Sequence, residues 1–271
     1  MFPTILIFFL FGLIIGSFLN VVLFRTEKNG SLGGRSHCRS CGALIHWYDN
    51  IPLLSFILLR GQCRKCGVRI SFQYPLVELA TGLLFGLSGL LVFRLEEPSS
   101  WLVASWWCFL FSVLLLISVY DLGHMEIPLS FLLFGVGGGV VYLIGASWFS
   151  LGQTDFLSWP LSRGLLGGGL AALFFYLLVW MSRERWMGMG DVWLAFIAGL
   201  AVGPTAVLFL LTLSFTLGAL VAIVLLIMKK KELSSQIPFA PYLCVATVLL
   251  LLIQVLNPPW LYYFLFPGVS F

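Results

Sequence analysis

Charged residues are scarce in this sequence of 271 residues. Lysine and arginine together number 15 and aspartate and glutamate number 11, so that 10% of the chain is charged, whereas an average soluble domain carries about 25%. This scarcity excludes an ordinary soluble domain. The basic residues lie in short segments and form no extended basic face, so we expect no nucleic-acid partner.

The start of the chain lacks the features of a signal peptide. Its first apolar run covers residues 3–24, has no basic residue before it and is too long for the apolar core of a signal peptide. We therefore expect this run to remain in the protein as a membrane span.

Apolar residues, in contrast, make up 60% of the chain, and many lie in runs of about 20 residues that are long enough to cross a bilayer as helices. The sixth run is short because it meets Gly203-Pro204, where a helix is expected to break. The predicted fold class is an all-α polytopic membrane protein in contact with membrane lipid. Eight transmembrane helices are predicted, at residues 3–24, 76–93, 101–120, 127–149, 164–181, 191–203, 205–228 and 238–256.

The distribution of basic residues between the loops predicts the orientation of these helices. If alternate loops lie on opposite sides, 13 of the 15 lysines and arginines fall on one side, including Lys229–Lys231, and only Arg94 and Arg163 fall on the other. Loops rich in basic residues face the cytoplasm. We therefore expect the basic side to be cytoplasmic and both termini to be periplasmic.

Most of the predicted mass outside the membrane lies between the first two spans. We expect a first transmembrane helix at 1–24, a small cytoplasmic domain at 25–75 and a seven-helix membrane domain at 76–271. Two glycine runs, Gly137–Gly139 and Gly167–Gly169, lie inside predicted spans. Small residues at such positions let helix backbones approach closely, and the alternative is that they form flexible hinges.

Four of the six cysteines lie in the predicted cytoplasmic domain, in the two CxxC pairs Cys38 with Cys41 and Cys63 with Cys66. The pairs are separated by 21 residues, close to the spacing of zinc sites with four cysteine ligands. Four thiolates leave no open position for water, so the predicted zinc is structural and not catalytic. The alternative is a pair of redox-active dithiols, although a reducing cytoplasm disfavours a disulfide.

Two aspartates are expected at the same membrane depth. Asp121 ends the third predicted span and Asp191 begins the sixth, and both ends face the cytoplasm in the predicted topology. Carboxylates at such positions are costly and usually functional. Two that lie within a few ångströms share one proton and can activate water while protonating a carbonyl, as in aspartic proteases.

Two other interpretations of these aspartates remain open. Each carboxylate can simply face water at the headgroup level. Asp191 would then be favoured by the positive end of its own helix, although Asp121, at a helix C-terminus, has no such benefit. The pair can also form a relay in a proton-coupled transporter, but such sites usually lie near the bilayer midplane.

The chain as a whole resembles the prepilin peptidase family, the membrane aspartic proteases of the GxGD type that serve type IV pili and type II secretion. Each motif is weak evidence alone, but their order matches the family over nearly the whole chain. The matching segments are Gly16-Ser17-Phe18-Leu19-Asn20-Val21-Val22, the two CxxC pairs, Asn50-Ile51-Pro52-Leu53-Leu54-Ser55, Tyr74-Pro75-Leu76-Val77-Glu78, Asp121 with Ile127-Pro128, and Gly188-Met189-Gly190-Asp191.

The resemblance implies a function and a set of site residues. It implies a bacterial inner-membrane enzyme that cleaves the basic leader from prepilins or pseudopilins at the cytoplasmic face, with Asp121 and Asp191 as the catalytic pair. Gly188 and Gly190 would form the active-site loop. Family members with four cysteines often also methylate the new N-terminal amine with S-adenosylmethionine, and Glu78 is a candidate for that second site. A peptidase without methyltransferase activity is the alternative.

Overall fold

The structure is a computed structural model that describes residues 2–28, 30, 33–94, 96–149, 159–228 and 237–256. Lys229–Lys231, which contribute to the predicted orientation, lie outside these residues, as does the end of the chain. The described residues contain helices and loops and no β-strand, so the predicted all-α fold class is confirmed.

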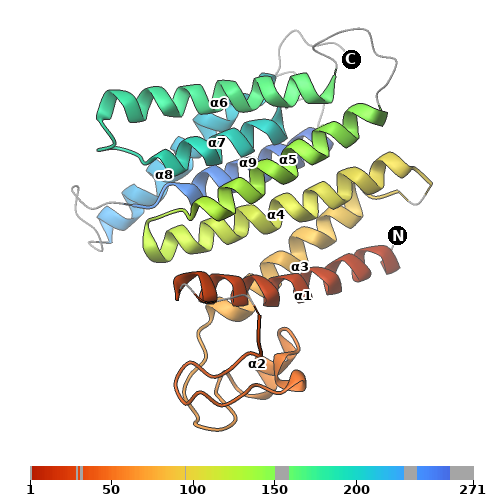
Figure 1. Cartoon of the computed structure of the whole chain (residues 1–271), viewed down its shortest axis with the longest axis vertical. Helices are drawn as coiled ribbons and strands as arrows, with labels where there is room; N and C mark the ends of the chain where they lie inside the picture. The colour runs from red at the N-terminus through yellow and green to blue at the C-terminus, as the bar shows by residue number, and fades with distance from the viewer. Residues whose placement is uncertain are drawn as a thin grey trace. The chain divides into compact units, whose positions relative to one another are not determined.

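In the part of the chain that the structure describes, eight apolar helices occupy the eight predicted spans (Figure 1). Six are long and apolar enough to cross a membrane, and the chain is therefore an integral membrane protein. Two others, α7 and α9, are shorter, with 14 and 17 residues. The eight helices are α1 (Phe2–Glu27), α3 (Gln73–Leu91), α4 (Pro98–His124), α5 (Leu129–Phe149), α6 (Pro160–Ser182), α7 (Met189–Val202), α8 (Val207–Ile227) and α9 (Ala240–Leu256).

The break between α7 and α8 lies at the predicted position. Gly203 has a φ of +79°, a left-handed backbone conformation that favours glycine. Pro204 then begins the short 3₁₀ helix η3 (Pro204–Ala206), which leads directly into α8. Because proline has no N–H to continue the preceding helix, α7 ends at Val202.

The contacts divide the chain into two compact units, Met1–Phe93 with Trp107–Ser112, and Arg94–Trp106 with Val113–Phe271. In the first unit, α3 packs on α1, and the segment between them contains the 3₁₀ helix η1 (Trp47–Asn50) and the short helix α2 (Leu54–Leu58). The domain boundary predicted at residue 75 stays a prediction.

Glycine allows the close packing of α1 on α3. A Cβ atom on Gly12 would lie 2.7 Å from the Thr81 carbonyl oxygen, and one on Gly16 would lie 2.7 Å from the Cα of Glu78. Asn20 of α1 donates a hydrogen bond from Nδ2 to the carbonyl oxygen of Tyr74, at 3.1 Å. These contacts fix the N-terminal end of α3, with Glu78, against the middle of α1.

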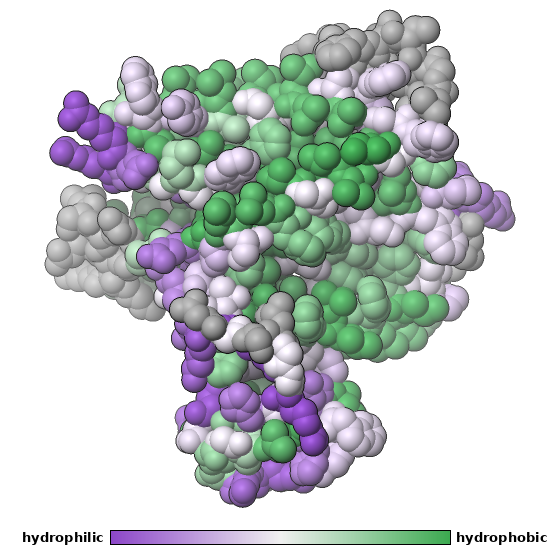
Figure 2. Space-filling view, viewed as in Figure 1, coloured by the Kyte–Doolittle hydropathy of each residue, from purple (hydrophilic) through white to green (hydrophobic). Residues whose placement is uncertain are grey.

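The second unit contains a still closer helix contact, between α6 and α7. A Cβ atom on Gly167 would lie 2.5 Å from the Gly199 carbonyl oxygen, and Gly168 faces Phe196. The outer faces of α5 and α6 carry exposed apolar side chains such as Leu133 and Leu173. Figure 2 shows mostly hydrophobic residues over the helices, as expected of surfaces that face lipid.

The two glycine runs act mainly through packing. Gly139 faces Leu200 and Trp106, and Gly167 and Gly168 contact α7, whereas Gly137 and Gly169 have no atom within 4 Å of an added Cβ. Helices α5 and α6 continue through both runs without a break. The structure therefore favours the packing role of the two glycine runs over the alternative, a flexible hinge within α5 or α6.

The α6–α7 contact gives a prediction with a control from the same glycine run. Gly167→Ala should destabilise the protein by about 1–3 kcal/mol, because the added methyl group forces two backbones apart. Gly169→Ala, which adds the same methyl group into open space, should leave stability unchanged or raise it by up to about 1 kcal/mol through helix propensity. Thermal unfolding in detergent measures both variants, and equal melting temperatures would contradict the prediction.

Candidate active site and metal centre

Asp121 lies in the last turn of α4, and its side chain is buried. The helix ends at His124. The next residue, Met125, has the left-handed backbone typical of a helix C-terminus and donates its N–H to the Asp121 carbonyl oxygen at 2.8 Å. A buried carboxylate is costly unless it is hydrogen-bonded. The position of Asp121 therefore requires a partner from elsewhere in the chain.

That partner is the first backbone N–H of α9. The N–H of Ala240 donates to Oδ2 of Asp121 at 3.1 Å. The first N–H groups of a helix have no partner within the helix and carry a partial positive charge. The start of α9 therefore stabilises a negative charge that the end of α4 alone would disfavour.

Sequence reasoning did not find this partner, which lies 119 residues away along the chain. Pro241 lies in the first turn of α9, a position typical of proline, and so marks a helix start. No feature of the sequence, however, indicates which carboxylate that helix start faces.

An aromatic cluster holds the start of α9 in place. The ring of Phe239, one residue before Ala240, lies 5.6 Å from that of Phe175 in α6 and 5.1 Å from that of Phe215 in α8. Phe175 is fully buried. Because α6 and α8 both contact this one residue, the position of the Ala240 N–H is set by packing.

Asp191 lies in the first turn of α7 and is half-buried. It is near enough to Asp121 for the two carboxylates to interact electrostatically. The thiol of Cys244 in α9 also interacts electrostatically with both aspartates. The structure thus brings the two aspartates together, one at the end of α4 and one at the start of α7, within the same unit.

The two glycines of the predicted active-site loop differ in their surroundings. A Cβ on Gly190 would lie 3.2 Å from the Cβ of Ile127, so this glycine lets the start of α7 approach the segment that follows Asp121. At Gly188 the nearest such atom is the Gly190 nitrogen, at 3.9 Å. A side-chain atom at Gly188 would therefore meet open space.

The four cysteines of the first unit form one cluster. Their sulfur atoms all lie within 4.8 Å of one another, and those of Cys38 and Cys66 are 3.8 Å apart. A tetrahedral zinc ion with Zn–S bonds of about 2.3 Å separates its sulfurs by about 3.8 Å. The donor set and its spacing therefore fit zinc, and these cysteines could hold it.

Each CxxC pair is closed by a glycine that sequence reasoning overlooked. Gly42 and Gly67 directly follow the second cysteine of their pairs and have φ values of +68° and +69°. Each donates its N–H to the carbonyl oxygen of the first cysteine of its pair, Cys38 or Cys63, at 3.0 and 2.9 Å. Both pairs have the sequence CxxCG, and this repeated glycine could have indicated the two turns.

The backbone around Cys38 also favours metal binding. Hydrogen bonds from the N–H groups of Cys41 and Ser40 lower the pKa of the Cys38 thiol to about 6. The thiolate is the form that binds metal, so these hydrogen bonds favour the metal-binding form of Cys38.

Glu78 lies in the first unit, separately from the two aspartates. It is buried in the second turn of α3, and its Oε2 accepts the N–H of Leu53 at 2.8 Å. Its carboxylate also interacts electrostatically with the hydroxyl of Ser17 in α1. Glu78 therefore joins the two helices to the segment between them.

These features define a class of protein: an integral membrane protein with a pair of carboxylates at adjoining helix ends and a separate four-thiol centre. Two family models match the chain. The bacterial peptidase A24 N-terminal domain matches residues 10–92, and the type IV leader peptidase family matches residues 108–223.

Characterised relatives cover most of the chain. A prepilin leader peptidase/N-methyltransferase from Myxococcus xanthus is 36% identical over 81% of this chain, which spans 62% of that protein. A type 4 prepilin-like proteins leader peptide-processing enzyme from Escherichia coli is 33% identical over 90% of this chain and 92% of its own length. No solved structure is significantly similar. The chain belongs to the type IV leader peptidase family, a family of proteases.

The four-cysteine cluster leads to a prediction about metal content. The purified protein should contain about one zinc ion per chain, and Cys41→Ser should lose most of it because one of the four ligands is weakened. Cys108→Ala, which changes a buried cysteine of α4 outside the cluster, should keep the metal. Elemental analysis after gel filtration measures both, and a wild-type protein without zinc would contradict the prediction.

Proposed function

We propose that this chain is a membrane aspartic endopeptidase with Asp121 and Asp191 as its catalytic pair. It cleaves the basic leader of type IV prepilins or type II secretion pseudopilins, and it then methylates the new N-terminal amine with S-adenosylmethionine. The observation that carries the peptidase assignment is the proximity of these two aspartates at adjoining helix ends of one unit. The names of the relatives favour both activities and the prepilin substrate.

The surroundings of the two acids suggest a division of roles. The N–H of Ala240 and the positive end of α9 favour the ionised form of Asp121, and two neighbouring carboxylates share one proton. We therefore assign the general base to Asp121 and the general acid to Asp191.

The proposed reaction then follows from acid–base chemistry. Asp121 takes a proton from water, the water oxygen attacks the scissile carbonyl carbon, and Asp191 donates its proton to the carbonyl oxygen. The tetrahedral intermediate collapses when the C–N bond breaks. Asp121 returns its proton to the leaving amine, and one hydroxyl of the intermediate returns a proton to Asp191 as the carboxylic acid forms. The open space beside Gly188 gives room for the substrate backbone near the acids.

The sidedness of the site is part of the proposal. In the orientation favoured by the basic loops, the ends of the helices that carry Asp121 and Asp191 face the cytoplasm, together with the four-cysteine segment. Both termini are then periplasmic, and the protein lies in the inner membrane. A substrate with a basic leader and an apolar helix would place its cleavage site at this same face.

We propose that the zinc ion held by Cys38, Cys41, Cys63 and Cys66 is structural. Four sulfur ligands complete a tetrahedral shell and leave no position for a reacting water. The ion would fix the two CxxCG turns relative to each other. Neither aspartate is part of this cluster, so the proposed cleavage does not pass through the metal.

Exchange of either aspartate tests the peptidase. Asp121→Asn and Asp191→Asn should each slow leader cleavage by about 100-fold or more, because each variant lacks one acid–base group. Glu126→Gln changes an exposed carboxylate close to Asp121 in sequence and should cleave at the wild-type rate. The assay follows the mass loss of a detergent-solubilised prepilin and a subsequent gain of one methyl group.

The outcomes separate the alternatives. Full cleavage by either aspartate variant would refute the catalytic pair. A wild-type protein that does not cleave the prepilin would favour the alternative, a relay in a proton-coupled transporter. Cleavage by the wild type without the methyl gain would identify a peptidase that lacks methyltransferase activity.

The backbone partner of Asp121 can be tested by its own substitution. Ala240→Pro removes the N–H while keeping a residue that suits a helix start, and it should slow cleavage by about tenfold because a hydrogen bond to a charged group is lost. Ala240→Gly keeps the N–H and should stay within about twofold of wild type. If both variants cleave equally well, the N–H of Ala240 has no role in catalysis.

A further inference from the structure

The short helix α2 presents an exposed apolar face. Leu54, Ile57 and Leu58 are 49%, 69% and 70% exposed, and their spacing of three and four residues places them on one side of the helix. Ser55, which points to a different side, is buried. These three exposed residues are called the α2 face below. Nothing in the proposed cleavage uses them.

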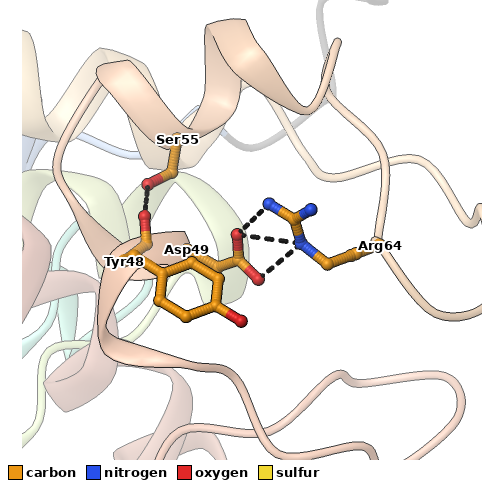
Figure 3. A network of polar contacts seen from close by, with 4 residues as sticks. All are labelled: Tyr48, Asp49, Ser55 and Arg64. Atoms are coloured by element: carbon orange, nitrogen blue, oxygen red, sulfur yellow. Dashed lines mark hydrogen bonds and ion pairs between the residues drawn. The ribbon is translucent and has the colours of Figure 1, made fainter.

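The polar contacts of α2 lie away from this face. The Ser55 hydroxyl donates to the Tyr48 carbonyl oxygen at 3.0 Å, which fixes α2 on η1 (Figure 3). The next residue of η1, Asp49, accepts hydrogen bonds from Nε and Nη2 of Arg64 at 2.6–3.1 Å, and this guanidinium holds the pKa of the Asp49 carboxyl below its usual range. Arg64 lies between the cysteines of the second CxxC pair. A chain of polar contacts therefore joins α2 to the four-cysteine cluster.

The start of α2 is attached to the apolar helices of the first unit. The N–H of Leu53 donates to the Glu78 carboxylate at 2.8 Å, and the Cα of Glu78 would lie 2.7 Å from a Cβ on Gly16 of α1. Gly16 is eight residues before Phe24, the end of the predicted apolar run, or about 12 Å along a helix. Glu78 is five residues after Gln73, the first residue of α3, or about 8 Å. Leu53 is therefore held beside the membrane spans and not at a distance from them.

The α2 face adjoins the exposed side of α3. Phe56 of α2 packs on Phe72 with ring centroids 5.4 Å apart, and Phe72, directly before α3, is 72% exposed. Leu76 and Leu83 continue this exposed apolar line along α3. Because α3 is long and apolar enough to span a membrane, its exposed side suits contact with lipid. A contiguous apolar surface of this kind marks a site for a membrane or for another protein.

The charge around α2 favours an anionic membrane over a protein substrate. Residues 33–75 contain six lysines and arginines and one aspartate. Arg60 lies two residues after the α2 face, and Arg69 forms an isolated β-bridge with Gln62 close by. Both arginines are exposed and form no ion pair among the described residues. An apolar face beside basic residues is typical of a helix that lies in the interface of an anionic membrane, whereas a basic leader peptide would be repelled.

We propose that the α2 face docks into the cytoplasmic leaflet and that Arg60 and Arg69 bind the phosphate groups of anionic phospholipids. Helix α2 then lies in the plane of the interface, with its apolar side chains about 5–10 Å into the boundary between headgroups and acyl chains. Through Ser55 and Asp49, this contact holds the four-cysteine segment on the membrane surface. The side of the membrane rests on the orientation given with the proposed function, whereas the docking itself requires only that α1 and α3 span the membrane.

A photoreactive side chain tests the docking directly. Benzoylphenylalanine is placed at residue 57 of the full chain in nanodiscs of phosphatidylcholine and phosphatidylglycerol, and mass spectrometry after irradiation should find phospholipid adducts on the α2 peptide. The same group at Leu133, an exposed residue of α5, is the positive control. At Leu44, an exposed leucine that pairs with His37 around the first CxxC turn, the adduct yield should be lower by about fivefold or more, because this residue lies outside the α2 face.

Hydrogen–deuterium exchange tests the basic residues. Exchange of residues 54–60 is compared between nanodiscs of phosphatidylcholine alone and nanodiscs that also contain phosphatidylglycerol. In the wild type, anionic lipid should slow this exchange by about fivefold or more, and the double variant Arg60→Gln, Arg69→Gln should lose most of the difference. Arg35→Gln, which removes another exposed arginine of the same segment, should keep it.

A third variant tests the apolar face. Ile57→Glu should speed exchange of residues 54–60 in both kinds of nanodisc, because a charged side chain leaves the interface. If the α2 face were in water, this substitution of an exposed side chain would have little effect. Zinc content and melting temperature are measured for every variant, so that a misfolded protein is recognised.

Several outcomes would overturn the inference. These are the absence of lipid adducts at residue 57 when residue 133 gives them, equal lipid adducts at residues 57 and 44, adducts to another protein chain in place of lipid, and wild-type exchange that anionic lipid does not change. Leader cleavage is assayed in the same wild-type nanodiscs. If cleavage is present and the lipid adduct is absent, only the inferred docking fails; if the adduct forms and cleavage is absent, only the proposed function fails.

Discussion

The hydrogen bond from the first N–H of α9 to the carboxylate of Asp121 is the interaction on which the candidate site depends. It places a negative charge at the end of α4, where the helix itself disfavours one, and compensates it with the positive end of another helix. The aromatic contacts of Phe239 with α6 and α8 fix the donor. A single carboxylate is therefore positioned by four helices of one unit.

The same unit shows how small residues allow a polar site to form among apolar helices. Gly190 lets the start of α7 approach Ile127, and Gly167 lets α6 approach α7 along its length. Without a side chain at Gly167 two backbones meet directly, and without one at Gly190 the start of α7 packs on the Ile127 side chain. The helix ends that carry the aspartates therefore converge. Helices in a bilayer depend on such close contacts, because the hydrophobic effect contributes little to their association in lipid.

Much of this arrangement could be predicted from the sequence, for physical reasons. A bilayer requires long apolar helices, so hydropathy located all eight of them, and the Gly203-Pro204 step located the break between α7 and α8. The spacing of the two CxxC pairs likewise indicated a four-thiol cluster. The hydrogen bonds of Asp121 with Ala240 and of Glu78 with Leu53 could not be predicted, because each depends on how distant segments pack and not on a local pattern.

The shortness of α7 and α9 has a consequence for hydration. At 1.5 Å per residue these helices measure about 21 and 26 Å, less than a hydrocarbon core of about 30 Å, and they supply Asp191 and the partner of Asp121. Such hydrophobic mismatch is relieved by a locally thinner bilayer or by polar surroundings at the helix end. We therefore expect water to reach a peptide bond held beside these helices without any opening of the bundle, so that the lengths of these helices determine the access of solvent.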